Sequence, residues 1–487
     1  MKRQYLPISL LCLAFAGQVF GANLVPNYAI ANLVLGQPDF VTSAVPTVHS
    51  SFSLRRPEAV VIDPMTRKVF VGDRNNSRVL RYADYASLLN GAGAEAVFGQ
   101  ARFSATSSGS GELNMNRPIG LHFDRLGRLW VADTSNNRVL MYEAASYRNT
   151  QPFPDRVFGQ PDFVTTTSAA SSTKMDTPYG VWIDSQDRLW VADSSNNRVL
   201  RFDSISTKAS GAAADAVLGQ GSFATSTSGV TSSSMDFPES VTVSSSGTLF
   251  VADANNNRVL RFANASSLGN GAGASAVLGQ VNFTTNTSGL TATTMGATTG
   301  VLITSSDTLW VTDRGNKRLL RFDGASTKAT GSAANGVVGQ PNFTTNTAVV
   351  TNRGSIDSYS QPFVDAAGSL WIADTESNRV LRFPADVTKP LLVVTPAVPA
   401  TITKSKVTIK GTASDAFGIS TIQYKIGNGA LKTATGTTSW QFKASLVSGK
   451  NTITIFAVDS VGNQSISKVI KIKRTSSAAP LSLAAIK

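Results

Sequence analysis

Short apolar runs separated by turn residues fill the first three quarters of the chain. A representative stretch holds Val181–Ile183, Leu189–Ala192, Val199–Phe202 and Ala216–Leu218. Runs of this length, bounded by Gly, Asn, Asp or Ser, predict four β-strands. The inner runs are apolar at consecutive positions, which indicates that both faces of each small sheet are covered. The pattern therefore predicts an all-β fold in which four-stranded sheets stack on one another.

The four-strand unit recurs six times. The aspartate of a V-A-D-x-x-N-N-R-V-L-R-F phrase returns after 60 residues four times and then after 61. A Gly-Gln pair, with a Phe three residues later, returns after 63 residues once and then after 60 four times. Units of one length that cover both faces of their neighbours predict a six-bladed β-propeller. The repeated aspartate and arginine pairs are Asp73 and Arg78, Asp133 and Arg138, Asp193 and Arg198, Asp253 and Arg258, Asp313 and Arg318, and Asp374 and Arg379.

The two ends of the repeat array predict how the ring closes. The Gly-Gln strand ends each unit, yet one copy, Asn32–Gln37, precedes the first full unit, and the last unit stops at Phe383 without one. We therefore expect Leu33–Leu35 to lie beside Val380–Phe383 and to complete the sixth blade. Such closure removes an open sheet edge, where other chains would otherwise pair.

A second domain is predicted after the ring. Residues 405–474 alternate apolar and polar positions between turn signals such as Asn428-Gly429, which predicts a β-sandwich of about seven strands. The ring is assigned to residues 23–386, a Pro-rich linker to 387–404 and a flexible tail to 475–487.

The first 22 residues have the pattern of a secretory signal peptide. Lys2 and Arg3 precede the apolar run Tyr5–Phe20, and small residues follow it. A membrane anchor is the alternative, but the run is shorter than the roughly 20 apolar residues of a spanning helix, and no later segment qualifies. We expect a secreted, periplasmic or cell-surface protein with no transmembrane segment in the mature chain.

Composition narrows the chemistry. The two histidines, His49 and His122, and the single Cys12 in the leader exclude a multi-histidine zinc site or a disulfide framework in the mature chain. The net charge of +13 is concentrated: residues 389–487 hold thirteen Lys and Arg and only two acidic residues, whereas 23–388 are neutral. A neutral ring argues against nucleic-acid binding.

Several sequence phrases in the chain resemble those of known families. The phrases VADTSNNRVLMY, VADSSNNRVLRF and VADANNNRVLRF resemble the NHL repeat over roughly residues 31–386. The phrases VTIKGTASDAFGISTIQYKI and GKNTITIFAVDSVGN, with Trp440, resemble bacterial immunoglobulin-like modules of secreted and surface proteins. The resemblance implies a six-bladed propeller, but NHL propellers include RNA-binding modules, sensor domains and relatives that are lyases, so it selects no activity.

The repeated polar residues are interpreted as scaffold. Asp and Asn side chains can hydrogen-bond the turn between the second and third strands, and each Arg can brace the Asp or a neighbouring blade. An aromatic residue three positions before each Asp is assigned to the core. Function is therefore expected where the six copies differ.

The loop that enters each first strand and the turn between the second and third strands open on one face of a propeller, and there the copies differ. Acids, bases and aromatics mix without a sign bias, which suits a peptide or glycan ligand; an ordinary solvated rim is the alternative. The candidate ligand-binding residues are Glu58, Arg74, Arg117, Tyr179, Glu239, Arg314, Lys317, Tyr359 and Glu376.

The sequence favours a non-catalytic binding or adhesion protein, with no catalytic residue, metal or cofactor assigned. The basic module is expected to attach to an anionic surface polysaccharide, the alternative being lysines that only protect strand edges. The rival function is a metal-assisted lyase or lactonase in which Glu58 and Glu239 hold a divalent cation, although they are three blades apart on opposite sides of the ring. His122 is interpreted as a packed core residue, because its counterparts in other blades are mostly apolar.

Overall fold

The computed structural model describes residues 25–26, 29–143, 152–347, 356, 361–416, 418–459, 461 and 463–475. The predicted leader, Tyr359 and nearly all of the predicted tail lie outside these residues. The regular structure of the described residues consists of β-strands and short 3-10 turns. No helix in this part of the chain has the length and hydropathy needed to cross a membrane.

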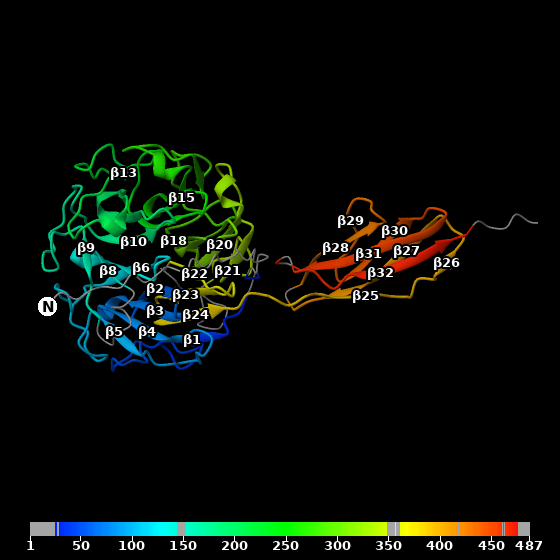
Figure 1. Cartoon of the computed structure of the whole chain (residues 1–487), viewed down its shortest axis with the longest axis horizontal. Helices are drawn as coiled ribbons and strands as arrows, with labels where there is room; N and C mark the ends of the chain where they lie inside the picture. The colour runs from blue at the N-terminus through cyan, green and yellow to red at the C-terminus, as the bar shows by residue number, and fades with distance from the viewer. Residues whose placement is uncertain are drawn as a thin grey trace, which may run out of the picture.

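A ring of six antiparallel four-stranded sheets forms the first body of the molecule (Figure 1). The first strands are β2 (Pro57–Ile62), β6 (Pro118–Phe123), β10 (Pro178–Ile183), β14 (Pro238–Val243), β18 (Thr298–Ile303) and β22 (Phe363–Val364). The second strands are β3 (Lys68–Asp73), β7 (Leu129–Asp133), β11 (Leu189–Asp193), β15 (Leu249–Asp253), β19 (Thr308–Asp313) and β23 (Leu370–Asp374).

The outer half of each blade repeats equally closely. The third strands are β4 (Arg78–Asp84), β8 (Arg138–Tyr142), β12 (Arg198–Phe202), β16 (Arg258–Phe262), β20 (Arg318–Asp323) and β24 (Arg379–Phe383). The fourth strands are β5 (Ala96–Phe98), β9 (Arg156–Phe158), β13 (Ala216–Leu218), β17 (Ala276–Leu278), β21 (Gly336–Val338) and, in the sixth blade, β1 (Leu33–Leu35).

The 3-10 turns fall at two places in the repeat. Those between the second and third strands are η1 (Arg74–Asn76), η2 (Thr134–Asn136), η4 (Ser194–Asn196), η6 (Ala254–Asn256) and η8 (Arg314–Asn316). Those after the third strand are η5 (Ile205–Thr207), η7 (Ala265–Ser267) and η9 (Ala325–Thr327).

The ring closes as the sequence predicts. Strand β1 pairs antiparallel with β24, with Leu33 opposite Arg382 and Leu35 opposite Val380. The Asn32 amide donates to the Arg382 carbonyl at 2.9 Å, and Arg382 Nε donates to Asn32 Oδ1 at 2.9 Å. The predictions of six blades and of an N-terminal strand that completes the last one are both confirmed.

Apolar side chains fill the space between neighbouring blades. Phe70 of the first blade packs edge-on against Phe98 and, across the interface, against Phe123 of the second, with ring centroids 5.6 and 4.9 Å apart. The aromatic residue of every second strand is at most 2% exposed. These residues are Phe70, Trp130, Trp190, Phe250, Trp310 and Trp371.

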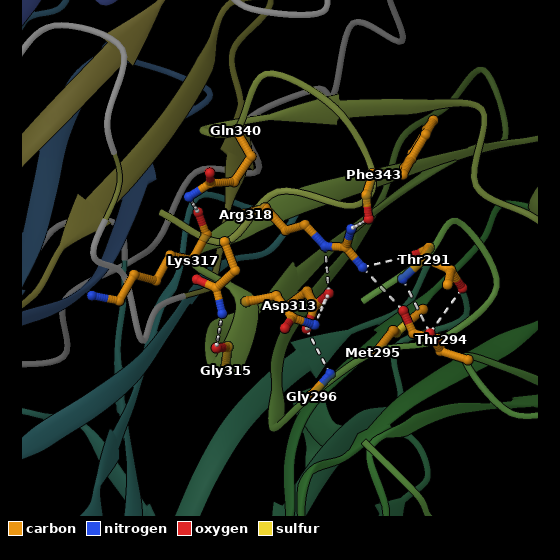
Figure 2. A network of polar contacts seen from close by, with 12 residues as sticks. Thr291, Thr294, Met295, Gly296, Asp313, Gly315, Lys317, Arg318, Gln340 and Phe343 are labelled. Atoms are coloured by element: carbon orange, nitrogen blue, oxygen red, sulfur yellow. Dashed lines mark hydrogen bonds and ion pairs between the residues drawn. The ribbon is translucent and has the colours of Figure 1, made fainter. Parts of the chain in front are cut away.

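A buried polar network organises each turn between the second and third strands, as Figure 2 shows for the fifth blade. Arg318 Nε donates to Asp313 Oδ2 at 2.7 Å, and its Nη2 donates to the carbonyls of Thr291 and Thr294 at 2.8 and 3.0 Å. Asp313 Oδ1 accepts the Gly296 amide at 2.7 Å. The arginine thus fastens the loop entering its blade to the loop leaving it, which contains Phe343.

The bonds that cross from one blade to the next come from other turn residues. Asn197 Oδ1 accepts the Phe237 amide of the following blade at 2.8 Å, and Ser194 Oγ donates to the Pro238 carbonyl at 2.6 Å. Asn197 has φ 53°, a left-handed conformation that Asn adopts more readily than most residues. These bonds between blades therefore come from the variable turn residues and not from the invariant Asp–Arg pair.

The second body is a β-sandwich of a three-stranded and a five-stranded sheet (Figure 1). Its core contains Tyr424 stacked on Phe442, with centroids 3.6 Å apart, beside Trp440. The three-stranded sheet has β25 (Leu391–Val394), β27 (Lys406–Ser414) and β30 (Ser439–Ser445). The five-stranded sheet has β26 (Thr401–Ile402), β32 (Lys468–Arg474), β31 (Gly449–Asp459), β28 (Ile419–Ile426) and β29 (Lys432–Thr433).

The predicted linker, residues 387–404, differs from the structure because it contains two of these strands. Strand β25 pairs with β27, and β26 pairs parallel with β32, so the sandwich has eight strands rather than about seven. Both lie at sheet edges, where neighbouring prolines cost no ladder hydrogen bond. The proline content that suggested a linker is therefore compatible with edge strands.

Candidate functional site

The first strands of the blades surround the propeller axis, and in the first five blades the second residue of this strand lies at one mouth of the central channel. In each of the first five blades, the pairing between the first and second strands shifts register just after the first residue of the first strand. A bulge of this kind redirects the side chain beside it. A cavity of about 20 Å³, enough for one water molecule or ion, lies there. It is lined by Glu58, Ile119, Gly120, Tyr179, Gly180, Glu239, Ser240, Thr299 and Gln361.

Glu58 and Glu239 come from the first and fourth blades, three blades apart as expected, and yet both line this one cavity. The channel is narrow enough at this mouth for residues from opposite blades to border the same space. Glu58 Oε1 pairs with Arg74 Nη1 at 2.7 Å, and both side chains are largely buried. Arg74 comes from turn η1, which directly follows the second strand of the same blade.

Burial controls the protonation of both glutamates. It raises the pKa of Glu58 to about 7, against the opposing attraction of Arg74. It raises the pKa of Glu239 to about 8; Arg314 lowers that pKa, and the nearby Glu58 raises it further. Two carboxyl groups that titrate near neutrality therefore sit at the mouth.

Arg117 and Tyr179 complete the cluster. Burial lowers the pKa of Arg117, helped by the neighbouring positive charge of Arg74. Burial and then Glu239 raise the pKa of Tyr179, whose ring packs edge-on against Phe237 with centroids 5.4 Å apart. We call the six residues that interact here the mouth cluster; they are Glu58, Arg74, Arg117, Tyr179, Glu239 and Arg314.

The other three predicted ligand-binding residues are not part of the mouth cluster. Glu376 forms an ion pair with Arg56 on the rim. Lys317 holds the left-handed position of its turn, and its side chain points away from the buried Asp313 network in Figure 2. Tyr359 lies outside the described residues.

The mouth cluster favours an anionic ligand over a bound cation. It combines three arginines with two glutamates whose raised pKa values leave them partly protonated at neutral pH. The guanidinium of Arg74 occupies the Glu58 carboxylate and repels a metal ion there. Guanidinium groups are well shaped to hold a carboxylate.

The opposite mouth of the channel holds a larger space that the sequence analysis did not identify. A cavity of about 400 Å³ lies there, continuous with a second of about 310 Å³ that shares several lining residues. Its wall includes His122, Trp182, Leu302 and Phe363, which occupy the same position in different blades. The sequence did offer one signal for this cavity: the residue at this strand position varies from blade to blade, whereas the residues around it repeat.

His122 belongs to this wall. It is half-buried, and its ring lies against Trp182 with centroids 4.3 Å apart. Burial lowers its pKa to about 4, so the imidazole is neutral at physiological pH. The interpretation of His122 as a packed core residue is therefore wrong in part, since one side of its ring borders the cavity.

The six sheets, the closing strand and the appended sandwich define the chain as a six-bladed β-propeller joined to an immunoglobulin-like domain. Two family models match parts of this chain, one within the propeller and one within the sandwich. The family model described as NHL repeat matches residues 235–262, and the model described as bacterial Ig domain matches residues 392–455.

Solved structures with a similar fold include enzymes. A streptogramin B lyase structure has 12% identity and a TM-score of 0.39, covering 69% of this chain and 94% of that one. Virginiamycin B lyase from Staphylococcus aureus has 11% identity and a TM-score of 0.37, covering 67% and 79%. Similarity at this level carries no information about activity. No curated protein matches the chain in sequence.

Proposed function

We propose that the protein is an exported, non-catalytic binding protein whose propeller mouth recognises a glycan or peptide that carries a carboxylate, while the basic Ig-like module attaches to an anionic surface polymer. One observation carries the proposal: five of the six blades contribute side chains to the mouth cluster, so that the charges of three arginines and two glutamates act on one another at one mouth of the channel. Repeated scaffold residues do not produce such a group.

The chemistry of the mouth cluster supports an acidic ligand. Arg117 forms no ion pair with an acidic side chain in the described structure, and its partly buried guanidinium can pair with a ligand carboxylate. Protonated Glu239 can donate a hydrogen bond to the same ligand, and the Tyr179 ring offers an apolar face. The cavity itself is small, so the ligand is expected to lie on the mouth rather than to enter the channel.

The module supports attachment to a polyanion. Lys468, Lys471 and Lys473 are exposed along β32, and Lys450 lies directly opposite Lys473 on the neighbouring strand. Like charges placed opposite each other in a sheet are unfavourable on their own. A polyanion would relieve this repulsion, and the attraction would weaken as salt increases.

The test is an array of acidic and neutral glycans and peptides, probed with the full mature chain at two salt concentrations. We expect Arg117→Ala to weaken binding of the best acidic ligand at least about tenfold, the loss of one charge-assisted contact. Arg102→Ala, which removes an exposed arginine that is not part of the mouth cluster, is the control and should bind as the parent does. Loss of binding in Trp182→Ala but not in Arg117→Ala would place the ligand at the opposite mouth and overturn the proposal.

A lyase or lactonase is the second candidate function, because Glu58 and Glu239 titrate near neutrality at one cavity and such groups suit general acid-base catalysis. The distinguishing variant is Glu239→Gln. It abolishes turnover of a lactone or cyclic-ester substrate if this candidate is right. Under the binding proposal, no array ligand is consumed by the parent protein and the variant still binds.

A further inference from the structure

Both acidic residues of the basic Ig-like module lie at the same end of the sandwich. Asp415 directly follows β27, Asp459 ends β31, and Asp386 joins them from the segment that leaves the last propeller strand. One carboxylate oxygen of each lies within 4.8 Å of one from each of the others. Carboxylates this close repel one another when they are ionised, unless a proton or a cation compensates their charge.

Two of the three carboxylates are buried and incompletely satisfied. Asp386 is 2% exposed and Asp459 is 1% exposed. Asp459 Oδ1 accepts the amides of Val461 and Asn463, each at 2.9 Å, and Asp386 Oδ1 accepts the Thr388 amide at 3.0 Å. The Oδ2 atom of each is buried without a hydrogen-bond partner.

Basic side chains do not neutralise these two aspartates. The segment 389–487 holds thirteen Lys and Arg residues, yet within the described part of the chain none forms an ion pair with Asp386 or Asp459. Buried carboxylates are normally paired with a cation or coordinate a metal. The unpartnered oxygens and the convergence of the three groups are separate observations with the same explanation.

We propose that Asp386, Asp415 and Asp459 form a binding site for a divalent cation, and that the cation is Ca²⁺. All the side chains offered are hard oxygen donors, which select Ca²⁺, Mg²⁺ or Mn²⁺ over softer metals. Several protein carboxylates around one point suit Ca²⁺, whereas Mg²⁺ keeps most of its water and seldom uses a dedicated protein cage. The sequence alone predicts no metal at this place, because the three aspartates are distant in the chain and meet only in the folded structure.

The site would join the two bodies of the molecule. Asp386 lies three residues after β24 ends, and its carbonyl accepts a hydrogen bond from Asn463 Nδ2 at 2.9 Å. A cation shared by Asp386 and Asp459 would fasten the segment leaving the propeller to the end of the sandwich. Calcium would then stiffen the connection between the mouth cluster and the attaching module.

The experiment is calorimetric titration of CaCl₂ into the full mature chain after treatment with EDTA and removal of the chelator. We expect one Ca²⁺ per chain with a Kd below about 1 mM, the weak end for extracellular modules. MgCl₂ should bind more weakly. Thermal unfolding should show one transition that shifts to higher temperature with Ca²⁺.

Three variants locate the site. Asp459→Asn, Asp386→Asn and Asp415→Asn keep the shape of the side chain and should each weaken Ca²⁺ binding at least about tenfold, with loss of the thermal shift. Asp162→Asn is the matched control, because Asp162 Oδ1 also accepts two loop amides, those of Val164 and Thr165, but has no part in the cluster. It should bind as the parent does.

Two results would overturn the proposal. One is the absence of binding heat and of any thermal shift in the parent protein up to about 10 mM Ca²⁺, well above the range for extracellular sites. The other is parent-like Ca²⁺ binding by all three cluster variants. If one variant fails to fold, the parent titration and the remaining variants still decide the question.

Discussion

The propeller and the Ig-like module use charge in opposite ways. The propeller buries six Asp–Arg pairs completely, all with Nε to Oδ2 distances of 2.7 Å, and surrounds them with further hydrogen bonds. The module leaves its lysines exposed, and where it meets the segment leaving the propeller, two aspartates are each buried with one unpartnered oxygen. A charged side chain that recurs in every blade with all its partners present belongs to the scaffold. A charged side chain that occurs once and has an unpartnered buried atom indicates a binding site.

The same distinction applies inside the propeller. The mouth cluster occurs once, and its glutamates have strongly shifted pKa values with few fixed partners. The Asp–Arg pairs recur in all blades, and each arginine also binds loop carbonyls, as Arg258 does with those of Phe283, Thr231 and Ser234. Sequence repetition therefore separates structural from functional charge, and the following predictions test that separation.

The largest expected effect comes from breaking one buried pair. Arg258→Ala leaves Asp253 buried without its cation and frees the carbonyls of Phe283, Thr231 and Ser234, so we expect a loss of about 3–5 kcal/mol in the free energy of unfolding. Denaturant unfolding followed by tryptophan fluorescence measures it, because five of the six tryptophans are in the propeller.

The matched change in the module is Lys443→Ala, at an exposed position of β30. It should alter stability by less than about 0.5 kcal/mol, as surface substitutions usually do. If Arg258→Ala costs no more than Lys443→Ala, the proposed difference between the two regions does not exist.

A smaller but still large effect is expected at the closing strand. Leu35→Ala removes a fully buried side chain from β1 and should cost about 3 kcal/mol, within the usual range for such truncations. Leu278→Ala is the counterpart in β17, where the strand is continuous with its own blade. Equal losses in both variants would show that the closing strand is held as firmly as the others. A loss below about 1 kcal/mol for Leu35→Ala alone would contradict closure in solution.

Much of the fold was predictable, because the interactions that define it are local and repeat with the sequence. The spacing of Asp73 and its five counterparts counts the blades, and the displaced Gly-Gln strand identifies the closure. The prediction of a linker over residues 387–404 was wrong because it rested on their proline content. Prolines are compatible with strands at a sheet edge, and β25 and β26 are edge strands.

The candidate site was predictable only in part. The face was inferred from loop positions, and six of the nine residues assigned to it meet in the mouth cluster. The approach of Glu58 to Glu239 depends on the bulges and on the width of the channel, neither of which the sequence encodes locally. The aspartate cluster depends on which strand ends meet in the sandwich, so spacing alone could not reveal it.

The pH dependence of stability tests the mouth cluster. The folded-state pKa of Glu239, about 8, exceeds its unfolded value near 4.5, so its favourable contribution is complete below pH 4.5 and is lost as pH rises to 8. The glutamine of Glu239→Gln cannot ionise, so the free energy of unfolding of this variant should fall about 1–2 kcal/mol less than that of the parent between pH 5 and pH 8. The expected difference is modest because Glu239 is half-buried and solvent screens its charge. Unfolding curves at several pH values measure the difference. The same slope in both proteins would mean that Glu239 ionises normally when folded.

The smallest effect on stability, and a selective effect on binding, is expected from the lysines of the module. Lys473→Ala removes the repulsion from Lys450 on the opposite strand, so stability should stay within about 0.5 kcal/mol of the parent or rise slightly. Retention on a polyanionic resin should nevertheless fall, and the difference should vanish at high salt as the charges are screened. Arg117→Ala is the informative comparison, because it should reduce acidic-ligand binding at the mouth and leave resin retention by the module nearly unchanged. If each variant lowered acidic-ligand binding and resin retention equally, the propeller and the module would not be separate binding surfaces. The two regions would then differ only in how their charges affect stability.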